Sequence, residues 1–255
     1  GYVVVAHDHP GCGFTVMGHA DRHHLTASGF RDTMQSTRFV NDWIRCRYPA
    51  NPIYLYGHSM GSFVALHSLQ LGLDIDGVIC SGSHYENPAK LKLQRLAIRM
   101  LSTIWGSKSP AIIPHRMTFG HLNNPFIKES KGNLTKSLDS SVLWLTSNPV
   151  ERKKYVMDSM CGQMVTLGYF EQMVPLLHNI STEDLWITMG KAPPLLFMTG
   201  QNDPLSEGGD RVDTLISVIK KGPISDISHH RIVGARHKIE HEADTMVVKR
   251  ILLEW

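Results

Sequence analysis

The stretch formed by residues 53–61 constrains the fold of this chain more than any other. Residues 53–56 have strand character, Gly-His-Ser-Met-Gly occupies positions 57–61, and a helical pattern starts directly at 62–66. A strand, a sharp Gly-x-Ser-x-Gly turn and a helix place a serine at the edge of a parallel sheet. We expect a side chain at either glycine of the motif to collide with the strand or helix beside the turn. The alternative is a chance motif in a buried turn, and partners for Ser59 would decide between the two.

Length and composition indicate an ordinary globular protein. The 255 residues are enough for one large α/β core or for a core with a subdomain, and 42% are hydrophobic and 19% charged. The formal charge is +3 with no block of Lys or Arg, which does not suggest a nucleic-acid partner. No apolar run approaches the length of a membrane span. The four cysteines have neither ligand spacing nor the density of a disulfide framework, which favours a reducing compartment, the cytoplasm.

Short apolar runs alternate with helical patterns in both halves of the chain. Residues 2–6 read as a parallel strand buried on both faces. Further strands are expected at 53–56, 76–82, 194–199 and 227–233, and helices at 31–48, 62–72, 207–220 and 240–255. This alternation predicts an α/β fold with a mostly parallel, doubly wound sheet.

The alternation stops between residues 83 and 190. Helical patterns appear there near 90–105, 134–146 and 149–178, without a strand of comparable quality. We therefore expect a core made of residues 1–82 and 191–255, with residues 83–190 inserted as a helical cap. The 90–105 helix is basic and amphipathic, so either it packs its apolar face with its basic face in solvent, or it touches a lipid surface.

A serine hydroxyl needs a base, and the base needs a group that orients it. Asp203 follows the expected 194–199 strand, and His237 follows the expected 227–233 strand. Because the carboxyl ends of parallel strands meet at one sheet edge, both side chains are expected near Ser59. The Met60 N–H, at a helix N-terminus, is the expected donor to an oxyanion formed at Ser59.

Two histidine patterns suggest metal sites but fit them poorly. His7 and His9 lie in the turn expected after residues 2–6, and no third ligand is evident. His237-Lys238-Ile239-Glu240-His241 fits the HxxEH pattern of inverted zinc peptidases. A preceding strand and Gly234 place His237 in a loop, so no metal and no cofactor is expected. His241 and Glu242 are expected in the first turn of the last helix.

The ordered motifs resemble one known family, the monoacylglycerol lipase and lysophospholipase branch of the α/β-hydrolases, also called serine-aminopeptidase-like hydrolases. The resemblance rests on four stretches in this order: residues 6–13, 57–61, 200–204 and 234–237. Cys12 stands where the family usually has His, and Ser62 where it usually has Gly. The family also implies an HG-containing loop and further strands before Gly1, so we expect the sequence to lack its N-terminal strands and the second oxyanion donor.

The resemblance implies a serine ester hydrolase with Ser59 as nucleophile, His237 as base and Asp203 as acid. The expected substrates are acyl esters such as monoacylglycerols or lysophospholipids. A peptidase or small-ester esterase on the same residues is one alternative. A non-catalytic hydrolase-like binding protein is another.

Overall fold

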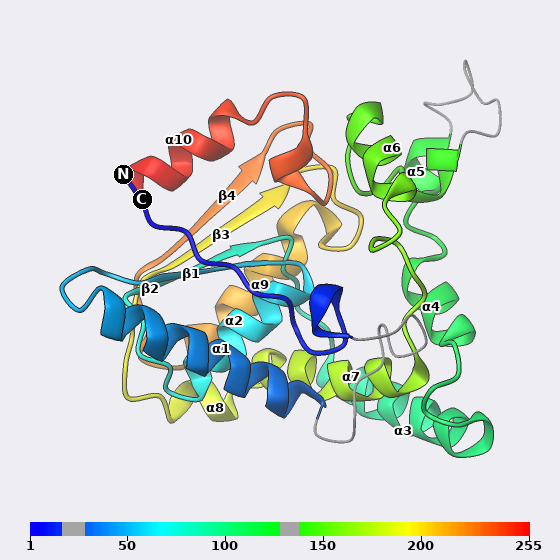
Figure 1. Ribbon diagram of the computed structural model, residues 1–255, viewed down its shortest axis with the longest axis horizontal. Coiled ribbons are helices and arrows are strands. Elements are labelled where there is room, and N and C mark those ends of the chain that lie inside the picture. Colours follow the sequence, from blue (N-terminus) through cyan, green and yellow to red (C-terminus); the bar gives the residue numbers. More distant parts are fainter. Residues whose placement is uncertain (17–28, 128–137) are drawn as a thin grey trace.

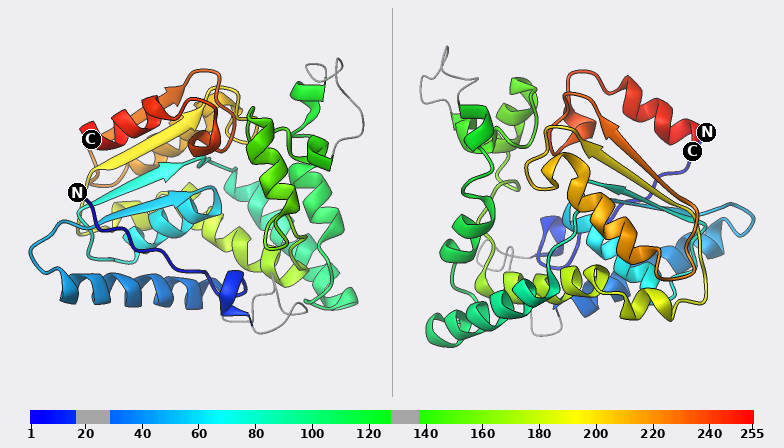
Figure 2. Two further views of the ribbon diagram at one scale, coloured as in Figure 1. Left: turned by 45° about the horizontal axis from the view of Figure 1, so that its top comes forward. Right: turned by 180° about the vertical axis from the view of Figure 1, so that it is seen from behind.

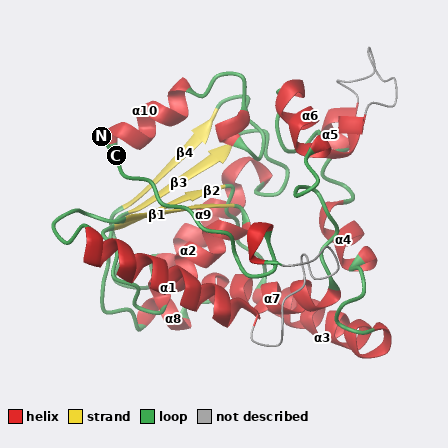
Figure 3. Ribbon diagram, viewed as in Figure 1, coloured by secondary structure: helices red, strands yellow, loops and turns green. Residues whose placement is uncertain are grey.

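A single parallel sheet organises the computed structural model, which describes residues 1–16, 29–127 and 138–255. Its strands are β1 (Tyr54–His58), β2 (Gly77–Ser81), β3 (Leu195–Gly200) and β4 (Ile227–Ile232), in the spatial order β1-β2-β3-β4. All neighbouring pairs are parallel. Figure 3 shows the sheet as one layer of strands among helices. The predicted α/β class and parallel sheet are confirmed.

Alternating side chains of the central strands divide the core into two faces. Val78, Cys80, Leu195 and Phe197 pack into the larger apolar cluster, and their sequence neighbours Ile79, Leu196 and Met198 into the smaller one. The larger cluster lies against α1 (Gly29–Arg47), α2 (Met60–Gln70), α7 (Leu167–Ser181) and α9 (Asp210–Ile219). The smaller lies against α10 (Met246–Glu254), on the opposite face of the sheet (Figures 1 and 2). Burial on both faces explains why β2 and β3 are uninterrupted apolar runs.

The segment between β2 and β3 is helical. It contains α3 (Pro88–Trp105), α4 (Ile112–Phe119), α5 (Asn124–Ile127), α6 (Pro149–Met157), α7 and α8 (Asp184–Ile187), with a 3₁₀ helix at Leu138–Val142. Helices α4, α5 and α6 stand beyond the ends to which the strands point (Figures 1 and 2). Helix α7 packs on α3 and α2 and shares the sheet's larger apolar cluster. Within the described ranges, no helix is both long and apolar enough to cross a membrane.

Two helices of this segment start at asparagine caps. The Asn87 side chain accepts from Ala89 N at 2.9 Å and Lys90 N at 3.3 Å. Asn148 accepts from Val150 N at 3.1 Å, and in both helices a proline occupies the first turn. Proline lacks the N–H that a first turn leaves unbonded, so Asn-Pro is a strong start signal.

The predicted strand at residues 2–6 is wrong. The residues are extended but do not join the described sheet, in which β1 is outermost and pairs with β2. Val4 is 86% exposed. An apolar run becomes a strand only when a neighbouring strand completes its hydrogen bonds, and the run itself carries no information about that neighbour.

Four predicted helices have different limits. The 149–178 pattern is two helices, α6 and α7, because Gly162 has a φ of 68° and a loop separates them. The last helix begins at Met246 rather than 240, after a 3₁₀ turn at Ile239–His241. Part of the 134–146 prediction lies outside the described residues, and 138–142 is the 3₁₀ helix. The 207–220 helix is a 3₁₀ turn at Glu207–Gly209 followed by α9.

Candidate active site

Ser59 occupies a strained turn between β1 and α2. Its φ of 52° and ψ of −121° lie in a region that non-glycine residues rarely adopt. Its N–H donates to Ser81 O at 2.8 Å, and its carbonyl accepts from Ser62 N at 2.9 Å and Ser62 Oγ at 2.6 Å. Such backbone strain costs about 1–3 kcal/mol and persists where surrounding bonds over-determine it. The turn holds Ser59, which is half-buried, at the carboxyl end of β1.

Only one of the two motif glycines is required by close packing. A Cβ at Gly57 would lie 2.3 Å from Gly61 O, so this position admits no side chain. A Cβ at Gly61 would meet nothing within 4 Å. The predicted collision at Gly61 is therefore wrong, because the first turn of α2 passes over Gly57 and leaves the outer side of Gly61 open.

Asp203 and His237 form a buried pair. His237 Nδ1 donates to Asp203 Oδ2 at 3.0 Å, and each residue is 1% exposed. Asp203 also accepts from Leu205 N at 2.9 Å and Ser206 Oγ at 3.0 Å. Burial acts to raise the pKa of Asp203, but the charge and hydrogen bond of His237 and these two donors outweigh it, so the net pKa lies below the ordinary value.

The loops that carry the pair are joined to each other. Gln201 N donates to Ile232 O at 2.9 Å, and Asn202 N to Ala235 O at 2.8 Å. These bonds link the ends of β3 and β4, as expected for adjacent parallel strands. The contact between Asp203 and His237 therefore follows from the adjacency of β3 and β4 and from these two backbone hydrogen bonds.

The other ring nitrogen of His237 has no hydrogen-bond partner among the described residues. Nε2 is buried, and no hydrogen bond joins it to Ser59 Oγ. The preceding residue, His58, does contact His237: their ring centroids are 4.9 Å apart. The structure thus brings Asp203 and His237 into direct contact. Ser59, the candidate nucleophile, directly follows His58, whose ring contacts that of His237.

Gly82 provides room for the His237 ring. It follows β2, has a φ of 61°, and a Cβ there would lie 2.8 Å from His237 Cε1. We predicted this position only as the end of a strand. No local pattern marked it, because the constraint comes from a ring 155 positions further along the chain.

Trp144 lies against the other side of the site. Its ring centroid is 4.8 Å from that of His237, and its carbonyl accepts from His237 N at 3.3 Å. The Trp144 ring also stacks on the ring of Phe119, and their centroids are 6.0 Å apart. Sequence reasoning missed Trp144, since a lone tryptophan in the helical segment has no motif around it.

Glu240 lies near His58, beside the candidate catalytic group of Ser59, His237 and Asp203. The Tyr56 hydroxyl donates to Glu240 Oε1, and Glu240 Oε2 is 3.8 Å from His58 Nδ1. His58 Nδ1 is also 3.0 Å from Ser81 Oγ. Burial raises the pKa of Glu240 to about 7. Burial and then the nearby His237 hold the pKa of His58 well below its usual value.

The two histidines of the HxxEH pattern have separate carboxylate partners. His237 pairs with Asp203, whereas His241 Nδ1 is 2.9 Å from Glu151 Oε2 in α6. The expected placement of His241 and Glu242 in the first turn of the last helix is wrong, because that helix begins at Met246. Glu242 is instead a nearly buried acceptor in the loop.

Met60 starts α2, where N–H groups lack intrahelical acceptors. The Tyr169 hydroxyl of α7 donates to Met60 Sδ. This contact fixes the Met60 side chain against α7. Its amide belongs to the turn that carries Ser59.

Among curated proteins, the chain is similar to a probable aminopeptidase, YbaC, of Bacillus subtilis (strain 168). The two are 33% identical over 88 residues, which is 34% of this chain. That alignment spans only 26% of the relative's own length.

Solved structures with the same fold include three hydrolases. A thermostable carboxyl esterase from Bacillus coagulans has a TM-score of 0.81 at 16% identity, covering 97% of this chain and 76% of that one. A soluble variant of Saccharomyces cerevisiae monoglyceride lipase has a TM-score of 0.68 at 18% identity, covering 97% and 74%. A lipase in an open form has a TM-score of 0.78 at 15% identity, covering 96% and 77%.

The family described as "Hydrolase_4: Serine aminopeptidase, S33" matches residues 1–244. This match takes in β1 to β4, the turn at Ser59 and both loops of the buried pair. The chain therefore belongs to the serine aminopeptidase S33 family of α/β-hydrolases.

Proposed function

We propose that the protein is a serine ester hydrolase that forms an acyl-enzyme on Ser59. The observation that carries the proposal is the buried Asp203–His237 pair: its Nε2 has no hydrogen-bond partner among the described residues, and its ring contacts that of His58, the residue before the strained Ser59. His237 takes the Ser59 proton as Oγ attacks the acyl carbonyl, and then gives that proton to the departing alcohol. Water, deprotonated by His237, releases the acid and restores Ser59. Asp203 holds the ring with Nδ1 protonated and stabilises its cation.

The Met60 N–H is the proposed donor to the oxyanion of each tetrahedral intermediate. A helix N-terminus supplies both an unbonded amide and a favourable dipole there. The bond between Ser59 Oγ and His237 Nε2 forms in the proposed reactive state. Hydrogen bonds of this kind are often incomplete until substrate binds.

We propose acyl esters with an apolar chain, such as monoacylglycerols or lysophospholipids, as substrates. The rings of Trp144, Phe119 and Phe170 form a continuous aromatic row that starts at His237. Trp144 and Phe119 are half-buried and offer an acyl chain apolar surface beside His237, with Phe170 buried behind them. The yeast monoglyceride lipase among the similar structures supports the same class.

In the proposed domain division, residues 1–82 and 191–255 form the core and 83–190 the helical cap. The position of α4, α5 and α6 beyond the strand ends supports it (Figure 1). Helices α3, α7 and α8 join the cap to the core, since Leu91, Leu177 and Trp186 belong to the same larger apolar cluster as β2 and β3.

We also propose weak contact of the cap with an anionic lipid surface. From 88 to 119 the chain has six Lys or Arg residues and no Asp or Glu. On α3 the apolar side chains of Leu93, Leu96, Met100 and Ile104 are exposed, each by 58% or more. An exposed apolar stripe with basic neighbours suits a negatively charged membrane surface. Leu96→Glu should reduce sedimentation with phosphatidylglycerol vesicles, and equal sedimentation would contradict the contact.

The second candidate function is a peptidase on the same residues. The similarity to a probable aminopeptidase favours it, as does the description of the family. Cytoplasmic localisation is a further proposal, supported by the four cysteines, all of which are free thiols.

Labelling and a substrate series test the proposal. A fluorophosphonate should modify Ser59, and Ser59→Ala should abolish both labelling and hydrolysis of p-nitrophenyl esters. Turnover should rise from acetyl to medium-chain acyl esters and should exceed that of aminoacyl p-nitroanilides. The reverse order would favour the peptidase. An unlabelled, inactive protein that still binds fatty acid would favour the non-catalytic alternative.

A further inference from the structure

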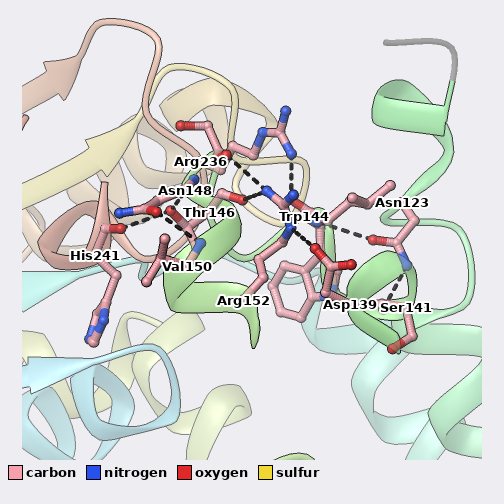
Figure 4. Close-up of polar contacts among 12 residues, drawn as sticks. Asn123, Asp139, Ser141, Trp144, Thr146, Asn148, Val150, Arg152, Arg236 and His241 are labelled. Carbon is pink, nitrogen blue, oxygen red and sulfur yellow. Dashed lines mark hydrogen bonds and ion pairs between the residues drawn. The ribbon is translucent and has the colours of Figure 1, made fainter. Parts of the chain in front are cut away.

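A short segment of the cap runs along the loop that carries His237. Residues 143–147, here called the strap, meet this loop through two backbone bonds: His237 N donates to Trp144 O at 3.3 Å, and Lys238 N to Leu145 O at 2.7 Å. Figure 4 shows Trp144 and Thr146 of the strap beside Arg236 and His241 of the loop. The bonds follow one another along both segments, so the strap and the loop share a fixed register.

Glu242 joins the two ends of this contact. Its Oε1 accepts from Arg236 N at 2.8 Å, and its Oε2 accepts from Ser147 N at 3.0 Å and from the Ser147 hydroxyl. The residue is 9% exposed. One carboxylate therefore holds the residue before His237 and the last residue of the strap. Buried N–H groups left without an acceptor are costly, so the carboxylate defines where both segments lie.

The strap is also held from the cap side. Asn123 Oδ1 accepts from Trp144 N at 3.0 Å. Arg152 donates to Thr146 O at 3.0 Å and to Ser147 O at 2.8 Å, and pairs with Asp139 at 2.9 Å (Figure 4). The strap is thus a rigid connection between α6 and the His237 loop.

Trp144 transmits the position of the strap to the imidazole. Its ring lies 4.8 Å from that of His237 at 41°, while the His58 ring lies 4.9 Å away. The His237 ring has one hydrogen bond, at Nδ1, which leaves rotation about that bond to be limited by packing. A shift of the strap moves the Trp144 ring, which is one of the two rings that limit rotation of the His237 ring.

We propose that Glu242 is a positioning residue: by binding Arg236 N–H and Ser147 together, it holds Trp144 against His237 and sets the direction of Nε2. The role in turnover rests on the proposed function, whereas the effect on the His237 ring does not. Glu242 touches neither Ser59 nor the proposed acyl chain, so it acts through His237 alone.

The test compares Glu242→Ala, Glu242→Gln and the exposed control Glu254→Gln, all assayed well below their melting temperatures. Glu242→Ala should lower kcat for p-nitrophenyl acetate by about tenfold to a hundredfold with KM nearly unchanged, because a misplaced base costs rate rather than binding. Glu242→Gln keeps an acceptor for Arg236 N–H and should recover most of kcat. Glu254→Gln should match the parent protein.

A second readout follows His237 directly. The downfield proton resonance of His237 Nδ1–H should shift or broaden in Glu242→Ala and stay in place in Glu254→Gln. A lowered melting temperature with unchanged kcat and resonance would reduce Glu242 to a structural role and overturn the proposal. A raised KM with unchanged kcat would also overturn it.

Two outcomes separate this proposal from the proposed function. If the parent protein hydrolyses no ester but the resonance still shifts in Glu242→Ala, the positioning holds and the ester hydrolase assignment fails. If Glu242→Ala does not fold, Ser147→Ala removes only the hydroxyl bond. It should then give a smaller shift in the same direction, and an unmoved resonance would overturn the positioning.

Discussion

Replacing Glu240 with Gln should change how stability depends on pH. The Glu240 side chain is 28% exposed, and burial raises its pKa to about 7 from an ordinary 4.5. Between these two values the native state keeps a proton that the unfolded chain releases. Stability therefore falls as pH rises from 4.5 to 7, and the loss is complete above 7.

The interval from 4.5 to 7 corresponds to about 3 kcal/mol in the free energy of unfolding. Gln has the shape of the protonated acid, accepts from the Tyr56 hydroxyl and does not ionise. The free energy of unfolding of Glu240→Gln, taken relative to that of the parent protein, should therefore rise by most of about 3 kcal/mol between pH 5 and pH 8. Burial and then His237 hold the pKa of His58 well below its usual value, so His58 offers little compensating charge at the upper end of this range.

Urea denaturation of both proteins at pH 5, 6, 7 and 8 measures this difference, with the exposed Glu254→Gln as control. The control should show a difference that does not vary with pH. If the Glu240→Gln difference is constant to within about 0.5 kcal/mol, a change of less than half a unit in pKa, the carboxyl ionises normally and the reasoning from burial is refuted.

Further predictions follow from other parts of the site and core. Asp203→Asn should leave the fold unchanged and lower kcat for ester hydrolysis by about 10⁴-fold; a loss of only tenfold would contradict its role. Gly82→Ala places a Cβ 2.8 Å from His237 Cε1 at a φ of 61°, so it should cost more than about 1 kcal/mol in urea melts and lower kcat. Asn87→Ala should cost about 1 kcal/mol by removing the α3 cap. Phe197→Ala, in a fully buried position, should cost about 3–5 kcal/mol, and a loss under 1 kcal/mol would contradict its place in the core.

Local sequence was sufficient for the elements whose signals are local. Strands β2 and β3 are buried on both faces, so each reads as an unbroken apolar run with turn residues at its ends. The Gly-x-Ser-x-Gly motif identified the turn at Ser59 because strand, turn and helix are contiguous. Placing Asp203 and His237 after adjacent strands was enough to predict their contact, since adjacent parallel strands bring their following loops together.

Only the tertiary structure decided the remaining features. Residues 2–6 have the composition of a strand, but pairing depends on a neighbour and not on the run itself. Gly82 is required by a ring that belongs to a distant loop. Ser147 and Glu242 are 95 positions apart, and neither lies in a recognisable pattern. Sequence periodicity reports which face of an element is apolar, whereas contacts between distant loops arise when the whole chain is packed. The position of Trp144 on His237 was therefore decided by folding and could not be derived from residues 143–147 alone.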